Sequence, residues 1–175
     1  MSAKASPLPI IQNCWVVPDI AAAAKPWIAL GVGPFFLFDV DVPDALYRGK
    51  RVPLSFSVGL AQAGPLQIEF VCQHSPGPSA YRDTVPAGKS GFHHVCRALG
   101  GYDETVALLR KQGITLATEA VFNGSRFCYA DTRETLGCML ELLDESAAGT
   151  YLVETVRNAA IGWDGSDPLR RLPAP

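Results

Sequence analysis

The stretch "SGFHHVCRAL" (residues 90–99) places two of the chain's three histidines side by side. Its apolar content and β-branched residue favour a strand, and neighbouring side chains of a strand point to opposite faces. We therefore expect only one of the two histidines to serve a given site. His94 shares a face with Cys96, whereas His93 is expected to pack on the other face, toward the helices.

The segment that follows this strand repeats an order found near the N-terminus. His94 precedes Gly113 by nineteen positions, just as Gln12 precedes Gly31 by nineteen. Both halves show the pattern of one strand, one helix and three strands, and duplicated units of this size usually build one shared core. The sequence therefore predicts an α+β fold made of two βαβββ modules.

The predicted modules span residues 8–73 and 91–145. Residues 74–90 are rich in Pro, Gly and Ser and form the expected linker. Residues 146–175 are expected to carry one helix and a flexible tail. In the helix of the first module, Pro26 is expected to cause a kink or an early break.

The composition limits the classes of partner. The chain has 175 residues, 48% of them apolar and 18% charged, which is typical of a globular protein. A net charge of -2 gives no broad attraction to nucleic acid or to acidic membranes. No apolar run approaches the roughly 18 residues that a membrane helix needs, and no signal-peptide pattern opens the chain. The five cysteines lack CxxC spacing and read as reduced thiols of a cytoplasmic protein.

Two glutamates lie in the middle of apolar strands, Glu69 in "LQIEFV" and Glu141 in "MLELL". A buried carboxylate is costly unless it is paired or coordinates an ion. Strand alternation places each glutamate on the inner face together with a polar residue from the first strand of its own module, Gln12 or His94. Clustered imidazole and carboxylate groups are typical of metal sites. The sequence thus predicts four ligands of one divalent metal: Gln12, Glu69, His94 and Glu141.

Each of these residues also has an ordinary structural interpretation. A lone histidine such as His94 is more often structural, and Glu69 and Glu141 could be edge-strand charges that face solvent. Gln12 is the weakest of the four, since a glutamine at the start of a strand often only forms a hydrogen bond. The cysteines on the same face are expected to be small buried thiols. The apolar residues around both glutamates favour the metal interpretation.

Over residues 8–145 the sequence resembles the vicinal oxygen chelate superfamily, which includes glyoxalase I, methylmalonyl-CoA epimerase, extradiol dioxygenases and bleomycin-resistance proteins. The resemblance implies a glyoxalase-like fold, a cupped, barrel-like mixed sheet with helices outside, and metal ligands on the first and last strand of each module. The order Gln, Glu, His, Glu is similar to that of some glyoxalase I enzymes and differs at two positions from the usual order in the epimerases. The stretches that carry the resemblance are "QNCWVVPDI" (12–20), "LQIEF" (66–70), "GFHHVC" (91–96) and "GCMLELLDE" (137–145).

The resemblance implies a metal-dependent isomerase, epimerase or lyase that acts on a small carbonyl compound or thioester. The donor set suits Zn, Ni, Co, Mn or Mg. In glyoxalase I relatives the glutamate of the last strand moves the proton, which makes Glu141 the expected base and Glu69 a second acid/base or a pure ligand. The resemblance also implies a homodimer.

Two other functional classes stay open. In a non-enzymatic binding protein of the bleomycin-resistance type, the cup holds an apolar ligand and no metal. A dioxygenase with Fe(II) needs two histidines and one carboxylate, whereas this chain offers one suitably placed histidine. The four candidate ligands favour the isomerase, epimerase or lyase.

The basic, turn-rich stretch "ALYRGKR" (45–51) separates two predicted strands. Arg48 and Lys50 are candidates for binding a carboxylate or phosphate group of a substrate. A solvated turn is the favoured interpretation of this stretch.

Overall fold

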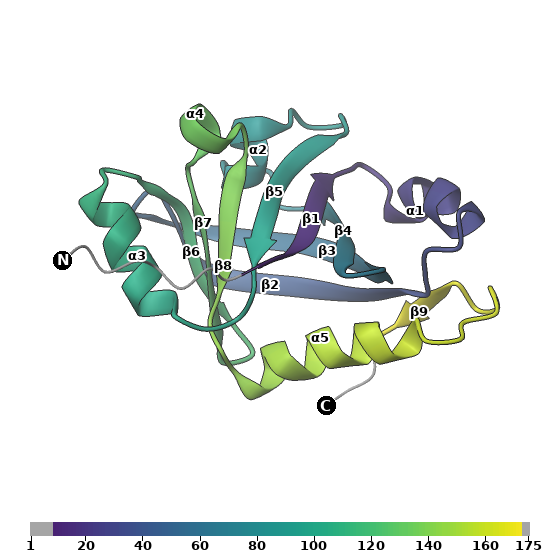
Figure 1. Ribbon diagram of the computed structural model, residues 1–175. Coiled ribbons are helices and arrows are strands. Elements are labelled where there is room, and N and C mark those ends of the chain that lie inside the picture. The colour runs from purple at the N-terminus through teal and green to yellow at the C-terminus, as the bar shows by residue number, and fades with distance from the viewer. Residues whose placement is uncertain (1–8, 173–175) are drawn as a thin grey trace.

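The structure, a computed structural model, describes residues 9–172 (Figure 1). The strands of the first half are β1 (Ile10–Val16), β2 (Phe35–Tyr47), β3 (Lys50–Ala63) and β4 (Leu66–Gln73). Those of the second half are β5 (Gly91–Arg97), β6 (Leu116–Phe122), β7 (Ser125–Ala130) and β8 (Met139–Leu143), followed by β9 (Leu169–Arg171). The helices are α1 (Ile20–Ala29), α2 (Ala80–Thr84), α3 (Tyr102–Lys111), α4 (Arg133–Leu136) and α5 (Ala147–Ala159).

All the strands belong to one mixed sheet in the order β3-β4-β1-β5-β8-β7-β6-β2-β9. Because β2 also pairs with β3, strands β1 to β8 close into a ring, while β9 adds to the other end of β2. Helices α1 and α3 lie outside this ring (Figure 1). The arrangement confirms the predicted fold of two βαβββ modules that form a barrel-like sheet.

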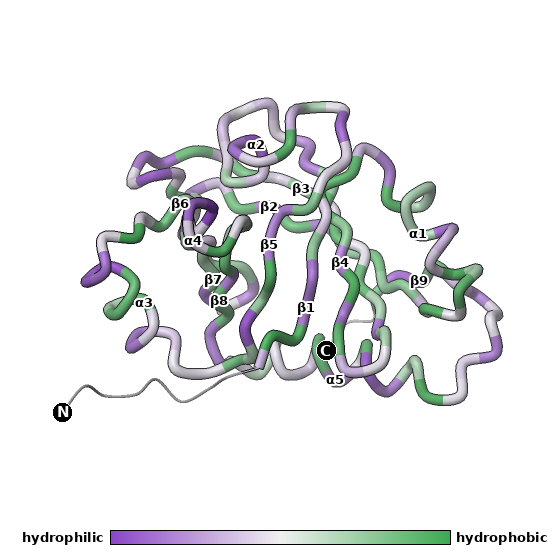
Figure 2. The backbone as a smooth tube through the Cα atoms, turned by 45° about the horizontal axis from the view of Figure 1, so that its top comes forward, coloured by the Kyte–Doolittle hydropathy of each residue, from purple (hydrophilic) through white to green (hydrophobic). Residues whose placement is uncertain are grey.

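The two modules meet where β1 runs antiparallel to β5. On its other side β1 pairs in parallel with β4, and β5 pairs in parallel with β8. These registers place the predicted ligands on two neighbouring rows across the strands. One row is Glu69, Cys14 and His94, and the other is Gln67, Gln12, Cys96 and Glu141. Figure 2 shows hydrophilic positions within the otherwise apolar strands β1 and β4.

The core is divided among three groups of buried apolar side chains. The largest joins strands of both modules with α2 and α5. A second lies beneath α1 and a third beneath α3. Helices α1 and α3 therefore cover outer faces of the sheet, as expected for amphipathic helices packed on a barrel, whereas α2 and α5 contribute to the group that joins both modules. In the described part of the chain, no helix is both long and apolar enough to span a bilayer.

Helix α1 begins after Asp19, whose Oδ1 accepts a hydrogen bond of 3.0 Å from the backbone N–H of Ala22. The helix continues through Pro26 to Ala29, so the early break is wrong, and the kink stays a prediction. Proline removes one backbone hydrogen bond from a helix, and its ring crowds the carbonyl of residue i−4. Ile20 and the other apolar side chains of α1 pack against the sheet, and this contact holds the helix together.

The hairpin of β2 and β3 closes the ring and is longer than the sequence predicts. Its turn consists of Arg48 and Gly49, both with positive φ (48° and 79°), as in the tight turns that suit twisted strands. A register shift between Val42 and Ala45 accommodates a proline within β2. Beyond this shift the tip of β2 pairs with β6, so the turn-rich stretch is the structural link between the modules.

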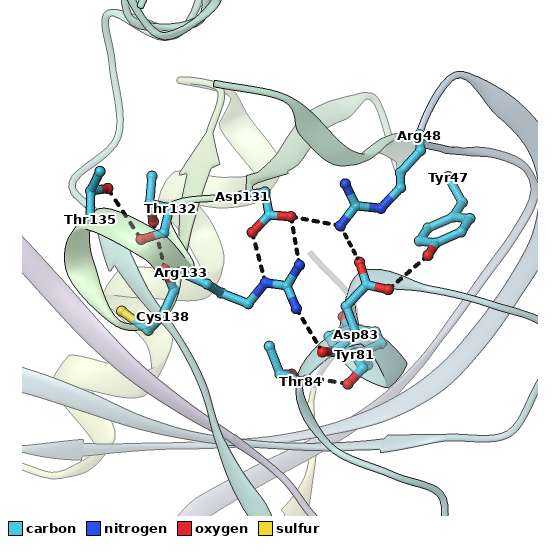
Figure 3. Close-up of polar contacts among 10 residues, drawn as sticks. All are labelled: Tyr47, Arg48, Tyr81, Asp83, Thr84, Asp131, Thr132, Arg133, Thr135 and Cys138. Atoms are coloured by element: carbon cyan, nitrogen blue, oxygen red, sulfur yellow. Dashed lines mark hydrogen bonds and ion pairs between the residues drawn. The ribbon is translucent and has the colours of Figure 1, made fainter. Parts of the chain in front are cut away.

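A network of ion pairs anchors the tip of this hairpin (Figure 3). Arg48 donates to Asp83 and to Asp131 at 2.6 Å each, and Tyr47 donates to Asp83 at 2.7 Å. Arg133 binds both oxygens of Asp131 at 2.7 and 2.8 Å, and together with Arg48 it holds the pKa of Asp131 well below its usual value. Residues 48–51 are exposed, as expected of a solvated turn, but Arg48 also forms ion pairs with carboxylates of two other segments.

The stretch 74–90, predicted as a linker, contains α2 and contributes to the core. Tyr81 and Ala80 are fully buried. Ser79 caps the helix by accepting from Arg82 N–H at 3.2 Å, and its own hydroxyl donates to Gln73 at 2.6 Å. The helix places the Tyr81 ring inside the barrel, next to the strands that carry the predicted ligands.

Gly59 of β3 provides a test of how closely α1 packs on the barrel. A Cβ atom at this position would lie 2.4 Å from Ile20 Cγ2 and 3.2 Å from Leu37 Cδ2. Because overpacking forces a backbone or rotamer shift, we expect Gly59→Ala to lower the free energy of unfolding by about 1–3 kcal/mol. Urea denaturation measures this change.

The matched control is Gly77→Ala, since a Cβ at Gly77 meets no heavy atom within 4 Å. This variant should unfold at the urea concentration of the unmodified protein. Equal midpoints for both variants would contradict the close packing of α1 on β3.

Candidate metal centre

Three of the four predicted ligands converge at one point inside the barrel. His94 Nε2 lies 3.0 Å from Glu141 Oε2 and 3.2 Å from Glu69 Oε2. The three side chains come from strands of both modules, and their ligand atoms lie within 4.8 Å of one another. The exposed fraction is 0% for His94, 5% for Glu141 and 8% for Glu69. The cluster is therefore a buried group of one imidazole and two carboxylates.

The electrostatics of the cluster favour a positive charge at its centre. Burial by itself lowers the pKa of His94, but Glu141 and Glu69 outweigh it and raise this pKa to about 9. Although the groups are close, neither Glu69 Oε2 nor His94 Nε2 makes a hydrogen bond of acceptable geometry within the described residues. A divalent cation binds buried carboxylate oxygens and an imidazole nitrogen whose lone pairs are available. The residues of this cluster therefore fit a metal.

Gln12, the fourth predicted ligand, lines the same cavity as the two glutamates and is 4% exposed. Its neighbour in register on β4 is Gln67, which is 2% exposed and also lines the cavity. Neither amide atom of Gln67 has a hydrogen-bond partner among the described residues. Gln67 is not among the ligands predicted from the sequence. Gln67 lies two residues before Glu69 on the same face of the strand, and this spacing could have identified it as a residue of the site.

His93 is packed against Tyr81 of α2 and hydrogen-bonded, as predicted, but it does not lie on the face opposite to His94, and that part of the prediction is wrong. Cys14 of β1 pairs with His94, whereas the next residue, Trp15, pairs with Phe92. His93 is thus the extra residue of a β-bulge, which breaks the alternation of side chains at this point. Both histidines of the pair are fully buried, and their Nδ1 atoms lie 2.7 Å apart.

The contact between the two histidines orients the ring of His94. The His93 ring packs against Tyr81 and Tyr129, with centroids 4.8 and 5.1 Å away, and burial together with His94 lowers the pKa of His93 well below its usual value. Because the pKa of His93 is lowered and that of His94 is raised, we assign Nδ1 of His94 as the donor and Nδ1 of His93 as the acceptor. The Nε2 atom of His94 is therefore the one that faces the carboxylates.

The cysteines near the cluster are buried free thiols, as expected. Burial and the nearby glutamates raise the pKa of Cys14 and of Cys96 well above the usual value. Because the thiolate is the reactive form, both thiols are poor nucleophiles here.

A cavity of about 170 Å³ opens from the carboxylates toward α5. Its inner end carries the polar side chains of Gln12, Gln67, Glu69 and Glu141. Its walls are mainly apolar side chains from β2, β3, β7 and α5. Helix α5 runs across this end of the barrel (Figure 1). His94 does not line the cavity and lies behind the carboxylates.

The fold and the site together define a class of protein: two βαβββ modules form a cup, and oxygen and imidazole donors lie at its centre. The family model of the Glyoxalase/Bleomycin resistance protein/Dioxygenase superfamily matches residues 11–129. The chain belongs to this superfamily, and the resemblance to vicinal oxygen chelate proteins is confirmed. A comparison with curated protein sequences gives no match.

Solved structures share the fold at low sequence identity. A hypothetical protein from Bacillus halodurans has a TM-score of 0.60 at 14% identity, over 81% of this chain and 96% of its own. Methylmalonyl-CoA epimerase from Mycobacterium tuberculosis has a TM-score of 0.54 at 14% identity, over 85% and 97%. A variant of Streptomyces coelicolor methylmalonyl-CoA epimerase in complex with 2-nitronate-propionyl-CoA has a TM-score of 0.51 at 16% identity, over 81% and 97%.

Proposed function

We propose that this protein is a divalent-metal-dependent isomerase, epimerase or lyase that moves a proton on the carbon next to a carbonyl group. The observation that carries the proposal is the convergence of Glu69, His94 and Glu141 from both modules at one point, where the two glutamates also line a cavity. Membership of the superfamily supports the same class of chemistry.

Glu69, His94 and Glu141 would hold the metal, with Gln12 as the fourth ligand. The set of two carboxylates, one imidazole and one amide oxygen suits Zn, Ni, Co, Mn or Mg. When bound, the cation supplies positive charge that polarises the substrate carbonyl.

The two glutamates are the acid/base groups of the proposed reaction, because both line the cavity. Glu141 takes the proton from the carbon beside the carbonyl, and the electron pair of the broken C–H bond moves toward the carbonyl oxygen. Return of a proton by Glu69, to the other face or to a neighbouring atom, gives an epimer or an isomer. His94 lies behind the carboxylates and does not line the cavity, so its role is that of a ligand.

A second candidate is a binding protein of the bleomycin-resistance type. The apolar walls of the cavity favour it, since such a cup holds an apolar ligand without chemistry. Dioxygenase chemistry has less support, because His93 contacts the far side of the His94 ring and only one histidine joins the carboxylates. The homodimer and the cytoplasmic location stay predictions.

Metal binding separates the two candidates. Protein prepared without chelator and then titrated with Co²⁺ or Ni²⁺ should bind one ion per chain, as measured by calorimetry and by the visible spectrum of Co²⁺. Glu69→Gln and Glu141→Gln each remove an anionic ligand and should weaken binding at least about 10-fold. The control Glu134→Gln alters an exposed glutamate and should bind like the unmodified protein. Absence of binding for Zn, Ni, Co, Mn and Mg would favour the binding protein.

Glu141→Gln tests the assignment of the base. Solvent deuterium should enter the acidic carbon of accepted carbonyl compounds or thioesters with the unmodified protein and not with this variant, because an amide cannot take the proton. Proton NMR in D₂O measures the exchange, and circular dichroism checks that the fold is intact. Exchange at the unmodified rate would show that Glu141 is not the base.

His93→Phe tests the orientation of the His94 ring. Loss of the hydrogen-bond acceptor should weaken metal binding about 10- to 100-fold, as is typical for partners of ligating histidines. His93→Gln keeps an acceptor and should restore part of the affinity. His74→Phe is the matched control, because His74 is exposed and contacts Ser57 instead of the cluster. Equal affinities for the two phenylalanine variants would exclude a positioning role for His93.

A further inference from the structure

We infer that the cavity accepts a compact, uncharged carbonyl compound with an apolar body about one aromatic ring in size, and that α5 is the element that recognises this body. The inference rests on the proposed function for the position of the carbonyl. It adds the substrate class, which neither the superfamily nor the ligand set determines.

The size of the cavity limits what it can enclose. Its volume is about 170 Å³. An engineered apolar cavity of about 150 Å³ in another protein encloses benzene. The enclosed part of a ligand is therefore one ring or an equivalent branched chain, and a nucleotide or peptide arm would have to lie outside.

The charges around the cavity disfavour an anionic substrate. Among the described residues that line it, the charged ones are Glu69, Glu141 and Asp144, all acidic. Arg126, the cation bound to Asp144 at 2.7 Å, also donates to both oxygens of Asp103 at 2.8 and 3.0 Å, so carboxylates already neutralise it. The charge of a divalent cation at the site would already be offset by Glu69 and Glu141, so a carboxylate or phosphate on the ligand would find no free cationic side chain and would meet Asp144.

The inner end of the cavity offers a neutral hydrogen-bonding group. Gln67 lines it, is 2% exposed, and has no partner for either amide atom among the described residues. Buried amides are normally hydrogen-bonded, and this one has no protein partner among the described residues, so it is available to a polar group of a ligand in the cavity. A carbonyl or hydroxyl oxygen can accept from its NH₂ group, and a hydroxyl can donate to its oxygen.

Beyond the inner end the cavity walls are mainly apolar and include α5, although Asn123, Ser125 and Asp144 also line the cavity. Phe38, Phe56 and Phe127 from the barrel line the cavity together with Leu152 and Val153 of α5. Aromatic walls of this kind favour a ring through edge and face contacts. The polar head of the ligand thus points to Gln67 and the glutamates, and its apolar body lies against α5.

The full chain, treated with chelator to remove metal, should be titrated by calorimetry with 2-hydroxyacetophenone, which is neutral and has one ring. Benzoylformate, an anion of similar size, and propionyl-CoA are the comparison ligands. We expect the neutral ketone to bind at least about 10-fold more tightly than either anion, since the anions meet only acidic groups. Tighter binding of benzoylformate or propionyl-CoA would overturn the inference.

Leu152→Arg tests the role of α5. A cation in the cavity should weaken binding of the neutral ketone and strengthen binding of benzoylformate, which reverses the order of the two ligands. Glu154→Arg introduces the same group on the exposed side of α5 and should leave the order unchanged. Leu152→Trp fills the cavity without a charge and should weaken both ligands, which keeps the test valid if the arginine variant fails to fold. An unchanged order in Leu152→Arg, or unchanged affinities in Leu152→Trp, would exclude recognition by α5.

These outcomes separate the substrate class from the proposed chemistry. Binding of the neutral ketone by a protein that takes up no divalent metal would leave the inference standing and reject the metal-dependent enzyme. Metal-dependent deuterium exchange on propionyl-CoA without binding of the ketone would reject the inferred substrate class and support the metal-dependent enzyme.

Discussion

The antiparallel pairing of β1 with β5 is the constraint on which the site depends. This seam joins the two modules and sets the register of four neighbouring strands. It brings Glu69 and Glu141, 72 positions apart in the chain, to the same imidazole. A shift by one residue at the seam would turn the side chains of a strand to the other face and disperse the cluster. The geometry of the site is thus a consequence of strand pairing, and no loop is needed to form it.

The same strand pairing buries two carboxylates next to each other, which is energetically unfavourable. Two carboxylates in apolar strands lose hydration, and only His94 offsets their charge within the cluster. This conflict between local sequence and burial is typical of functional sites, where polar groups are retained against the preference of the core. The raised pKa of His94 and the unpartnered amide of Gln67 are two signs of this conflict. Both indicate that the polar side chains in the interior serve a functional site and do not serve the packing of the core.

Strand alternation and the internal repeat predicted the two βαβββ modules and placed Glu69, His94 and Glu141 on inner faces, whereas the cupped sheet was implied by the family resemblance. These patterns extend over many residues, so a local irregularity does not change the prediction. His93 was misplaced because a single bulge reverses the alternation, and nothing in "GFHHVC" marks it. The burial of Tyr81 was missed because Pro and Gly around it are typical of loops. Arg48 lies in a turn as predicted, but its partners Asp83 and Asp131 are brought to it only by the tertiary fold.

The C-terminal segment stands apart from the symmetry of the barrel. Each βαβββ unit has a counterpart, whereas α5 and β9 have none among the described elements. The groups proposed for proton transfer belong to the duplicated part, and the helix proposed to contact the ligand belongs to the unique part. Substitutions in α5 therefore alter no strand register. This architecture allows one reaction centre to be combined with different ligand preferences through changes in a single helix.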